Sequence, residues 1–444
     1  PSILGNGSLI TNDTAAASLG LAAGDFFWHW LRSPTWTRSL VLGLFLALAI
    51  LAKMTWLILF GLWPIIAIVW FAVTKAEVSR NVTFFGVRCG QLIVSFVVAV
   101  WLINVFYDFD ETSLPYGEYE FISDSLTGIE EVVSFADSIP IPFPKQFTRG
   151  LDTQLSNLEE YGSPSYLLGQ WRDEGWWYYY LYGLLVKTPH GTQVLLLLAA
   201  ASLFCCSQGP SKRDIALLLL PAIAVLLVAS LKTALNLHFR YVLPSFGFLY
   251  VFLGILAIAM QRSKATGVVA CFLVTFSIAS TLWSYPHSLA YFNEAAGGPR
   301  NGHKHMLHSA LDWGQDLIFL QEWLERHPEI RLAGLAYHGG VNPRDVGLES
   351  PEPPYRADND TGWSNPQRPS AGPLPGYYAL SAMQIWGPQN RFDYFDQFVT
   401  PVASAGYSIY IYHITLDDAN RVRRELGLPE LPKERDREQE RVPP

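Results

Sequence analysis

Charged residues and cysteines are scarce in this sequence, and the short motifs of common soluble enzymes are missing. Charged side chains make up 16% of the 444 residues, whereas soluble domains carry about 25%. The chain has no P-loop, no HExxH pair and no GxGxxG turn after a strand. The net charge of −8 also disfavours nucleic acid as a partner. The usual nucleotide-binding and zinc-protease sites are therefore excluded.

The four cysteines lie in apolar segments and form neither a CxxC pair nor a disulfide framework, so we expect free, buried thiols. Long apolar sequence, in contrast, is abundant. It occurs in eight segments at about 13–31, 39–52, 55–74, 84–106, 190–206, 213–231, 242–261 and 266–284. A spanning helix needs about 20 apolar residues. The sequence therefore predicts a polytopic α-helical membrane protein whose second segment is short.

Lysine and arginine are concentrated in alternate connections between these segments. They occur at 32–38, 75–83, 207–213 and 262–265. Cytoplasmic loops carry such an excess, so these connections are predicted to be cytoplasmic. The opposite side then receives residues 1–12, 53–54, 107–190, 232–241 and everything after 285. The 107–190 loop has fourteen acidic and four basic residues, which suits an external segment.

The same patterning divides the chain into five parts. They are membrane segments at 1–106 and 191–285, an external loop at 107–190, an extracytoplasmic α/β domain at 286–428 and a charged, disordered tail at 429–444. In the α/β domain we expect helices in DLIFLQEWLERH and TLDDANRVRRELG, and strands in IRLAGLAY and YSIYIYHI. Asp312 is the candidate cap of the first helix, and Thr415 and Gly427 bound the second.

Ionisable residues gather at the predicted external edge of the membrane. Asp13 opens the first segment, either as an acid in a helical first turn capped by Thr11 or Asn12 or as a general base. Lys53 lies in a very short hairpin, either as a snorkelling side chain or as a functional cation. The pattern leaves both alternatives open.

Lys187 precedes Thr188 and Pro189, a pair that favours the start of a helix. A lysine there opposes the helix dipole, unless a bound anion faces both the ammonium and the free N–H groups. The alternative is an interface anchor.

Arg240, flanked by His238 and Tyr241, ends the last short external loop. With Lys53 and Lys187 it makes three cations from three separate connections. We predict that they converge on a phosphate at headgroup depth, where arginine offers a bidentate fork and lysine a point charge. Each is otherwise a boundary residue. His303, His305 and His308 have the spacing of no common metal site, so we predict no metal ligands among them and leave assistance by a divalent metal open.

Several blocks of sequence resemble the bacterial lipid-carrier-dependent glycosyltransferases of the GT-C fold, which are relatives of the protein O-mannosyltransferases and of the aminoarabinose transferases of lipid A. The blocks are PSILGNGSLITNDTAAA, LGLFLALAILAKMTWLILF, GWWYYYLYGLLVKTP, HFRYVLPSFGFLYVFLG and YFNEAAGGPRNGHKHMLHSALDWGQDL. They cover most of residues 1–320. The resemblance implies placement in the bacterial inner membrane and a polyprenyl-phosphate sugar as donor.

The resemblance also implies a reaction. An external aspartate activates a hydroxyl of an acceptor protein or glycolipid, which attacks the anomeric carbon with inversion while lysine and arginine stabilise the leaving lipid phosphate. By this similarity Asp13 is the base. The phosphate-binding set is Lys53, Lys187, Arg240, Tyr241 and His238.

The family's principal acidic motif, in the first external loop, has no match here, so we expect the chain to be a portion that lacks the first spans. Two alternatives to a transferase remain. One is a transporter or flippase of a lipid-linked substrate, which should carry ionisable residues at mid-depth of its spans. The other is a non-catalytic anchor that presents the terminal domain.

Overall fold

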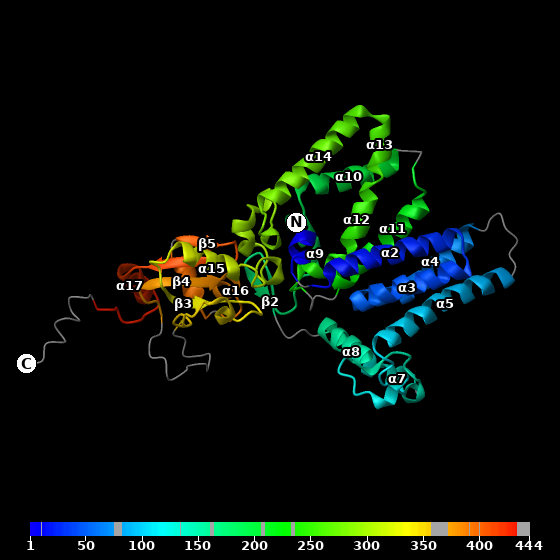
Figure 1. Cartoon of the computed structure of the whole chain (residues 1–444), viewed down its shortest axis with the longest axis horizontal. Helices are drawn as coiled ribbons and strands as arrows, with labels where there is room; N and C mark the ends of the chain where they lie inside the picture. The colour runs from blue at the N-terminus through cyan, green and yellow to red at the C-terminus, as the bar shows by residue number, and fades with distance from the viewer. Residues whose placement is uncertain are drawn as a thin grey trace, which may run out of the picture. The chain divides into compact units, whose positions relative to one another are not determined.

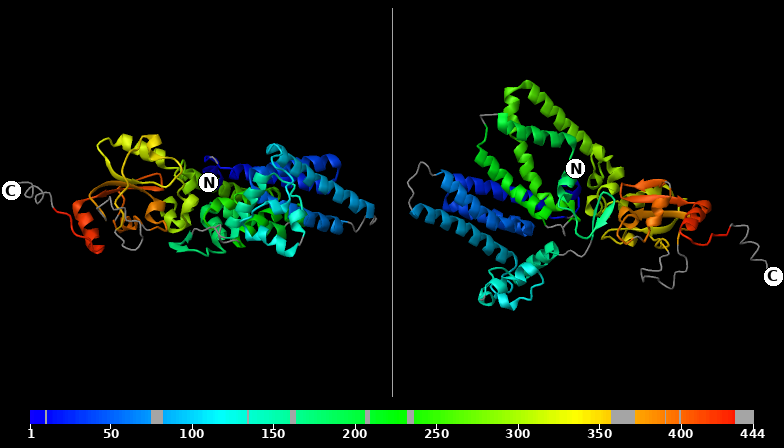
Figure 2. Two further views of the ribbon diagram at one scale, coloured as in Figure 1. Left: turned by 90° about the horizontal axis from the view of Figure 1, so that it is seen from below. Right: turned by 180° about the vertical axis from the view of Figure 1, so that it is seen from behind.

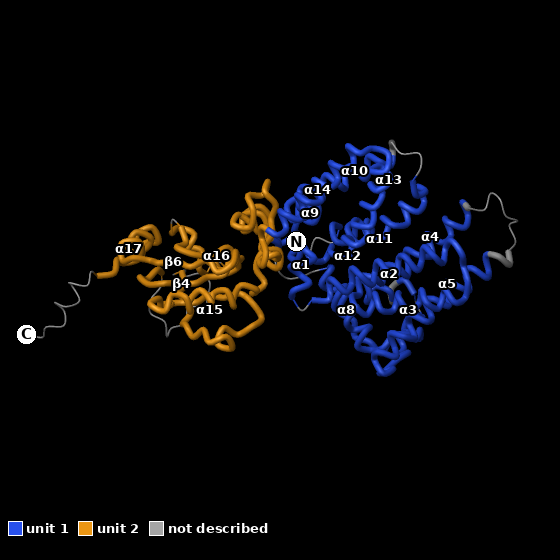
Figure 3. The backbone as a smooth tube through the Cα atoms, turned by 45° about the horizontal axis from the view of Figure 1, so that its top comes forward, with its two compact units in different colours: residues 1–165, 172–282 blue, residues 166–171, 283–444 orange. Residues whose placement is uncertain are grey.

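The computed structural model describes residues 1–9, 11–74, 82–133, 135–159, 164–205, 209–231, 236–356, 372–389, 391–398 and 400–432. The chain divides into two compact units (Figure 3). Unit 1 comprises residues 1–165 and 172–282, and unit 2 comprises 166–171 and 283–444. Most of the 75–83 connection, Cys206 and most of the 429–444 tail lie outside the described residues.

Unit 1 is built almost entirely of helices (Figures 1 and 2). They are α1 (Ser2–Gly7), α2 (Asp13–Arg32), α3 (Trp36–Ala52), α4 (Ile58–Thr74), α5 (Val82–Phe106), α6 (Asp124–Thr127), α7 (Ile129–Val132), α8 (Lys145–Glu159), α9 (Tyr179–Lys187), α10 (His190–Cys205), α11 (Lys212–Leu231), α12 (Pro244–Leu253), α13 (Leu256–Arg262) and α14 (Lys264–Trp283). Short 3-10 turns include η1 (Met54–Leu57), η3 (Tyr116–Glu118), η4 (Ala136–Ser138) and η6 (Phe239–Val242). Helix α3 packs between α2 and α5, around a core of apolar side chains that includes Phe27, Trp30 and Trp63.

Five helical stretches among the described residues are long and apolar enough to cross a membrane. They are Met54–Val73, Phe85–Phe106, Lys212–Leu231, Pro244–Arg262 and Lys264–Trp283. A sixth span results if α9 and the first part of α10, which meet at a bend of 113°, are counted together. Helix α3 is apolar but only 17 residues long, and α2 carries polar residues along its length. All eight expected segments are helical, but five or six meet the requirement for a span. The architecture fits a polytopic helical membrane protein.

Charged side chains collect at both ends of α2. Asp13 is its first residue, and at its other end Arg32 NH2 lies 2.8 Å from Asp214 Oδ2 of α11. Asp214 also accepts a hydrogen bond from Trp28 Nε1. A helix of 20 residues is about 30 Å long, which equals the thickness of a bilayer's hydrocarbon core, about 30 Å. The unit therefore has two polar ends separated by an apolar middle.

The segment between α5 and α9 forms a small module of its own, centred on α8. The Asp152 carboxylate of α8 accepts hydrogen bonds from the backbone N–H groups of Ile122 and Ser123, just before α6. Glu159, at the end of α8, accepts from the N–H groups of Asp124 and Ser125 in the first turn of α6. These carboxylates satisfy N–H groups that a helix start leaves without partners, and so they join α6 to α8.

Unit 2 contains a four-stranded mixed sheet in the order β3-β4-β6-β5. The strands are β3 (Leu332–Ala336), β4 (Gly376–Ser381), β5 (Ala403–Ala405) and β6 (Ile409–Ile414), and the helices are α15 (Leu317–Arg326), α16 (Ala382–Ile385) and α17 (Leu416–Glu425). β3 runs parallel to β4, and β6 is antiparallel to β4 and β5. Leu317 and Leu320 of α15 pack with Ile409 and Ile411 of β6 in one core. A short hairpin formed by β1 (Ser165–Leu167) and β2 (Gln170–Arg172) contributes residues 166–171 to this unit.

The expected strands and helices of unit 2 are present, but the role predicted for Asp312 is wrong. Thr415 caps α17, because its side chain accepts from the Asp418 N–H, and Gly427 follows with φ +71°. Helix α15, in contrast, has Asp316 at its N-cap position without a side-chain cap. Asp312 instead accepts hydrogen bonds from the N–H groups of Gly314 and Met383, in the interior of the unit.

Two predictions for unit 1 also need correction. Cys89 and Cys271 are free but exposed, on the outward faces of α5 and α14, because an apolar span turns part of its surface toward lipid. The helix predicted to start at the Thr188–Pro189 pair is present, but it begins one residue later than predicted. Thr188 is the C-cap of α9, and α10 begins at His190, with Pro189 immediately before it.

Candidate functional site

Three of the predicted residues meet at one end of the helix bundle. The Asp13 carboxylate is completely buried, and its two oxygens face two different cations. Lys53 Nζ lies 2.5 Å from Asp13 Oδ1, and Arg240 NH1 lies 3.5 Å from Asp13 Oδ2. The three residues come from the start of α2, the end of α3 and the turn η6. Segments separated by up to 227 positions thus form one ionic cluster.

Local structure explains why Asp13 and Lys53 face each other. Trp56, in the turn η1 just after Lys53, is fully buried and donates a hydrogen bond from Nε1 to the Ala16 carbonyl of α2. Its ring fits against Gly20, where a Cβ atom would lie 2.0 Å from the ring. Because α2 has no side chain at this position, η1 reaches its backbone. Lys53 is thereby held opposite the first turn of α2.

Asn12 does not cap α2 as the sequence suggested. It occupies the N-cap position, but its side chain makes no capping bond. Its Nδ2 instead donates to the carbonyl of Ala52, the last residue of α3, at 2.7 Å. Thr11 Oγ1 donates to the Asn6 carbonyl. Asn12 therefore links the start of α2 to the end of α3, next to the ionic cluster.

The cluster has one more positive than negative charge. Asp13 contributes one negative charge, and Lys53 and Arg240 contribute two positive charges. Burial lowers the pKa of Lys53, and the adjacent Asp13 carboxylate opposes this by favouring the charged form. The Tyr241 ring lies 5.1 Å from Lys53 Nζ and 5.6 Å from the Arg240 guanidinium carbon, and His238 packs edge-on against that ring. Within these three residues the formal charge is thus one positive unit.

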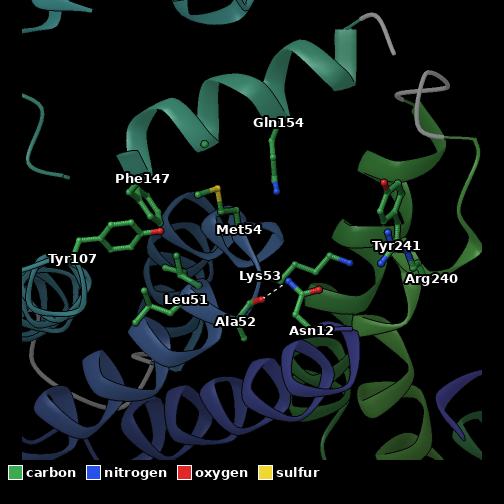
Figure 4. A pocket seen from close by; sticks show the side chains of 12 residues that line it. Asn12, Leu51, Ala52, Lys53, Met54, Tyr107, Phe147, Gln154, Arg240 and Tyr241 are labelled. Atoms are coloured by element: carbon green, nitrogen blue, oxygen red, sulfur yellow. Dashed lines mark hydrogen bonds between the residues drawn. The ribbon is translucent and has the colours of Figure 1, made fainter. Parts of the chain in front are cut away.

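A cavity of about 420 Å³ opens beside this cluster (Figure 4). Its polar lining is Asn12, Lys53, Gln154, Arg240 and Tyr241, and its mainly apolar lining is Ile50, Leu51, Ala52, Met54, Tyr107, Phe147 and Gly150. In the figure, the Gln154 side chain points from α8 toward Lys53. The cavity therefore presents cations and hydrogen-bonding groups to one part of a ligand and an apolar wall to another.

Part of this cavity was missed by the sequence predictions. Phe147, Gly150 and Gln154 all belong to α8 and lie three and four residues apart, so they form one stripe of that helix. Helical spacing within the 107–190 loop could have indicated α8. Only the folded chain shows that this stripe covers the hairpin at Lys53, where Met54 Cε would lie 3.1 Å from a Cβ atom at Gly150.

Three of the predicted site residues do not line the cavity in the described part of the chain: Lys187, His238 and Asp13, which is buried behind Lys53 and Arg240. Lys187 is buried at the C-terminal end of α9, a helix that packs against η6. The sequence prediction placed this lysine in front of a helix start, where it would oppose the dipole. At the last residue of α9 a cation interacts favourably with the helix dipole instead. The structure brings Asp13, Lys53, Arg240 and Tyr241 together and places Lys187 on the neighbouring helix.

The three histidines that are close in sequence, His303, His305 and His308, each contact a different group. His303 stacks on Trp386 at 4.0 Å between ring centroids, His305 Nε2 lies 2.9 Å from the Ala296 carbonyl oxygen, and His308 packs edge-on against Trp171. Burial is the main cause that lowers the pKa values of His303 and His308 to about 4. In the described part of the chain, no group of three or more His, Cys, Asp or Glu residues is arranged to hold a metal ion.

Comparisons with models of protein families, with curated proteins and with solved structures found no match to this chain. The site must therefore be interpreted from its own geometry and chemistry.

Proposed function

We propose that this protein is an inverting glycosyltransferase that moves a sugar from a polyprenyl-phosphate carrier to an acceptor hydroxyl. The observation that carries the proposal is that Lys53 and Arg240, which both face the buried Asp13 carboxylate, line a cavity that also has an apolar wall. A phosphate needs cations, and a prenyl chain needs apolar surface. The resemblance to GT-C transferases supports the same assignment.

The charges of the cluster suggest how donor binding prepares the base. Both carboxylate oxygens of Asp13 face cations. A donor phosphate competes for Lys53 and Arg240, because charge-assisted bonds from these groups to phosphate are strong. As the cations turn toward the phosphate, Asp13 loses part of its pairing and can accept a proton. Donor binding and activation of the base are therefore coupled.

The reaction follows from these roles. Asp13 takes the proton of the acceptor hydroxyl, whose oxygen forms a bond to the anomeric carbon from the side opposite the phosphate. The bond between that carbon and the phosphate oxygen breaks, and its electron pair leaves with the polyprenyl phosphate. Lys53 and Arg240 stabilise the charge that develops on the leaving group. Tyr241 contacts both cations through its ring, whereas Lys187 lies on the neighbouring α9.

We place this reaction at the extracytoplasmic face of a bacterial inner membrane, with a protein or glycolipid as acceptor. The bias of lysine and arginine toward the opposite connections supports this side. The length of α2, about 30 Å, separates the cluster from the Arg32–Asp214 pair by about the thickness of the hydrocarbon core, which supports a position for the cluster at headgroup depth.

The test uses purified full-length protein in nanodiscs with a radiolabelled polyprenyl-phosphate hexose, and it follows donor binding and sugar transfer separately. Lys53→Ala and Arg240→Ala should each weaken donor binding about 10- to 100-fold, because each removes a charged hydrogen-bond donor. Lys145→Ala is the matched control, since Lys145 pairs with Glu111 outside the cavity. Unchanged donor binding in both cluster variants would refute the proposal.

A second candidate is a protein that binds or moves a lipid phosphate without chemistry. The complete pairing of Asp13 favours it, because a paired carboxylate is a poor base. This candidate predicts that Asp13→Asn keeps full function in a flippase assay with a fluorescent polyprenyl phosphate and that no sugar is transferred. The transferase predicts loss of transfer in the same variant.

A further inference from the structure

Unpartnered apolar side chains project from the module between α5 and α9. They are Ile122 (64% exposed), Ile129 (36%), Val132 (84%), Phe135 (68%) and Ile139 (42%). They lie on or next to α6, α7 and η4, short elements that contact one another. Water-exposed protein seldom presents so many large apolar side chains within 18 residues. We call these five residues the apolar tip.

The module that carries the apolar tip is fastened to the end of α5. Asn104 of α5 donates from Nδ2 to the Pro142 carbonyl and accepts from Thr112 Oγ1. The Lys145 N–H, at the start of α8, donates to the Asp110 carbonyl. In Figure 1, α8 lies across the end of α5 and α7 lies beside that end. The apolar tip is therefore held at the side of the bundle, next to the end of a span.

The apolar surface continues from α5 to the module. Ile93, Val97 and Trp101 recur every four residues along α5 and are each more than half exposed, as is Phe106 at its end. This stripe belongs to a helix that is long and apolar enough to span a membrane, so lipid is its natural partner. Phe109, which is half exposed, extends the same apolar character past the end of the helix.

We propose that the apolar tip enters the outer leaflet of the membrane and holds α8 over the cavity. The partner is the acyl and interfacial region of a lipid surface, which matches apolar side chains beside a span. The sequence between 107 and 144 contains nine acidic residues and no lysine or arginine. It therefore lacks the positive charge that would attract anionic headgroups. Burial of the apolar side chains in the membrane is then the interaction that favours binding of the tip to lipid.

Anchoring of the tip has a consequence for the cavity. The carboxylates of Asp152 and Glu159 join α8 to α6, so an immobile α6 restrains α8. The opposite stripe of α8 places Phe147, Gly150 and Gln154 at the cavity. Membrane insertion of the tip therefore fixes the wall that covers Lys53. This inference concerns the module itself and does not depend on which reaction the cavity supports.

The first test measures the depth of the tip in the membrane. Full-length protein without native cysteines receives a nitroxide at Val132→Cys or Phe135→Cys in phosphatidylcholine nanodiscs, and its collisions with O₂ and with a water-soluble nickel chelate are compared by electron paramagnetic resonance. Nitroxides at both tip sites should collide more often with O₂ than with the nickel chelate, and so should a nitroxide at the lipid-facing reference Val97→Cys. Thr153→Cys, on the exposed face of α8, should show the reverse. A preference for the nickel chelate at the two tip sites, or protection from both reagents, would overturn the proposal.

The second test measures the restraint on α8. The double variant Val132→Asn, Phe135→Asn should exchange the backbone amides of residues 145–159 at least about tenfold faster than the parent protein in the same nanodiscs. Thr153→Asn serves as a polar control on α8 and should leave exchange in α6 and α7 unchanged. Equal exchange in parent and double variant would overturn the link between the tip and α8, whatever the outcome of a transfer assay.

Discussion

Replacing Asp13 by asparagine should make the protein bind a polyprenyl phosphate more tightly while it loses sugar transfer. The substitution removes the negative charge that Lys53 and Arg240 face at 2.5 Å and 3.5 Å. Asparagine keeps the shape and one oxygen acceptor, so the cluster can retain its packing. Lys53 and Arg240 no longer face this carboxylate, and a phosphate supplies negative charge to both of them.

The size of the effect can be worked from the distances. At about 4 Å and an effective dielectric constant of about 20, one ion pair is worth about 4 kcal/mol before its costs are subtracted. A donor phosphate must compete with that pairing in the parent protein. If only a third of it is recovered in the variant, about 1.4 kcal/mol, binding tightens tenfold. We therefore expect at least a tenfold decrease in Kd for a polyprenyl phosphate without sugar.

The assay is equilibrium binding of a radiolabelled polyprenyl phosphate to the protein in nanodiscs, with transfer from the sugar-loaded donor measured in parallel. Asp25→Asn is the matched control, because Asp25 is an exposed acid on the same helix that pairs with His29 and not with a residue of the cluster. Binding that is weaker or unchanged in Asp13→Asn would refute the idea that Asp13 and the phosphate share the same cations. Full transfer in this variant would remove Asp13 as the base.

Three further results are expected, each measured by thermal or chemical unfolding of the full-length protein. Gly20→Ala should destabilise unit 1 by about 1–3 kcal/mol, because its methyl group would overlap the buried Trp56 ring. Gly61→Ala is the control and should leave the stability of unit 1 unchanged, because a Cβ atom there meets no atom within 4 Å. Burial raises the pKa of Asp312 to about 7 from 3.8. Because the folded state then holds the proton more tightly than the unfolded state, the free energy of unfolding should fall as the pH rises from about 4 through 7, by at most about 1.4 kcal/mol per pH unit. The Asp312→Asn variant should lose this pH dependence. Thr415→Ala should cost about 1 kcal/mol through the lost cap of α17, while Thr415→Ser should keep most of it.

Local signals in the sequence predicted the helices and strands well and the burial of side chains less well. Apolar length marked α2 to α5 and α10 to α14. Thr415 and Gly427 marked both ends of α17, because a helix cap acts within one turn. The same reasoning failed for Asp312. Its role depends on Met383, which is 71 positions away and cannot be seen from spacing.

The candidate site shows the same division. Composition indicated that cations belong at one membrane edge, and the resemblance named Asp13, Lys53 and Arg240. Neither the composition nor the resemblance indicated that Asp13 would be fully buried with both carboxylate oxygens facing cations. That arrangement depends on a missing side chain at Gly20, which lets Trp56 reach α2. It also depends on the turn η6, which carries Arg240 to the start of the same helix.

The sequence by itself determined three features of this chain: many apolar helices, several of them long enough to span a membrane, the charges that lie between them, and the start of a small α/β unit. Hydropathy, charge and helix caps are local properties, so the sequence shows them directly. Only the tertiary structure decided which of these charges meet. It paired Asp13 with Lys53 and Arg240, set Lys187 on a neighbouring helix and laid α8 across the cavity, because these contacts join segments that are close in space but distant along the chain.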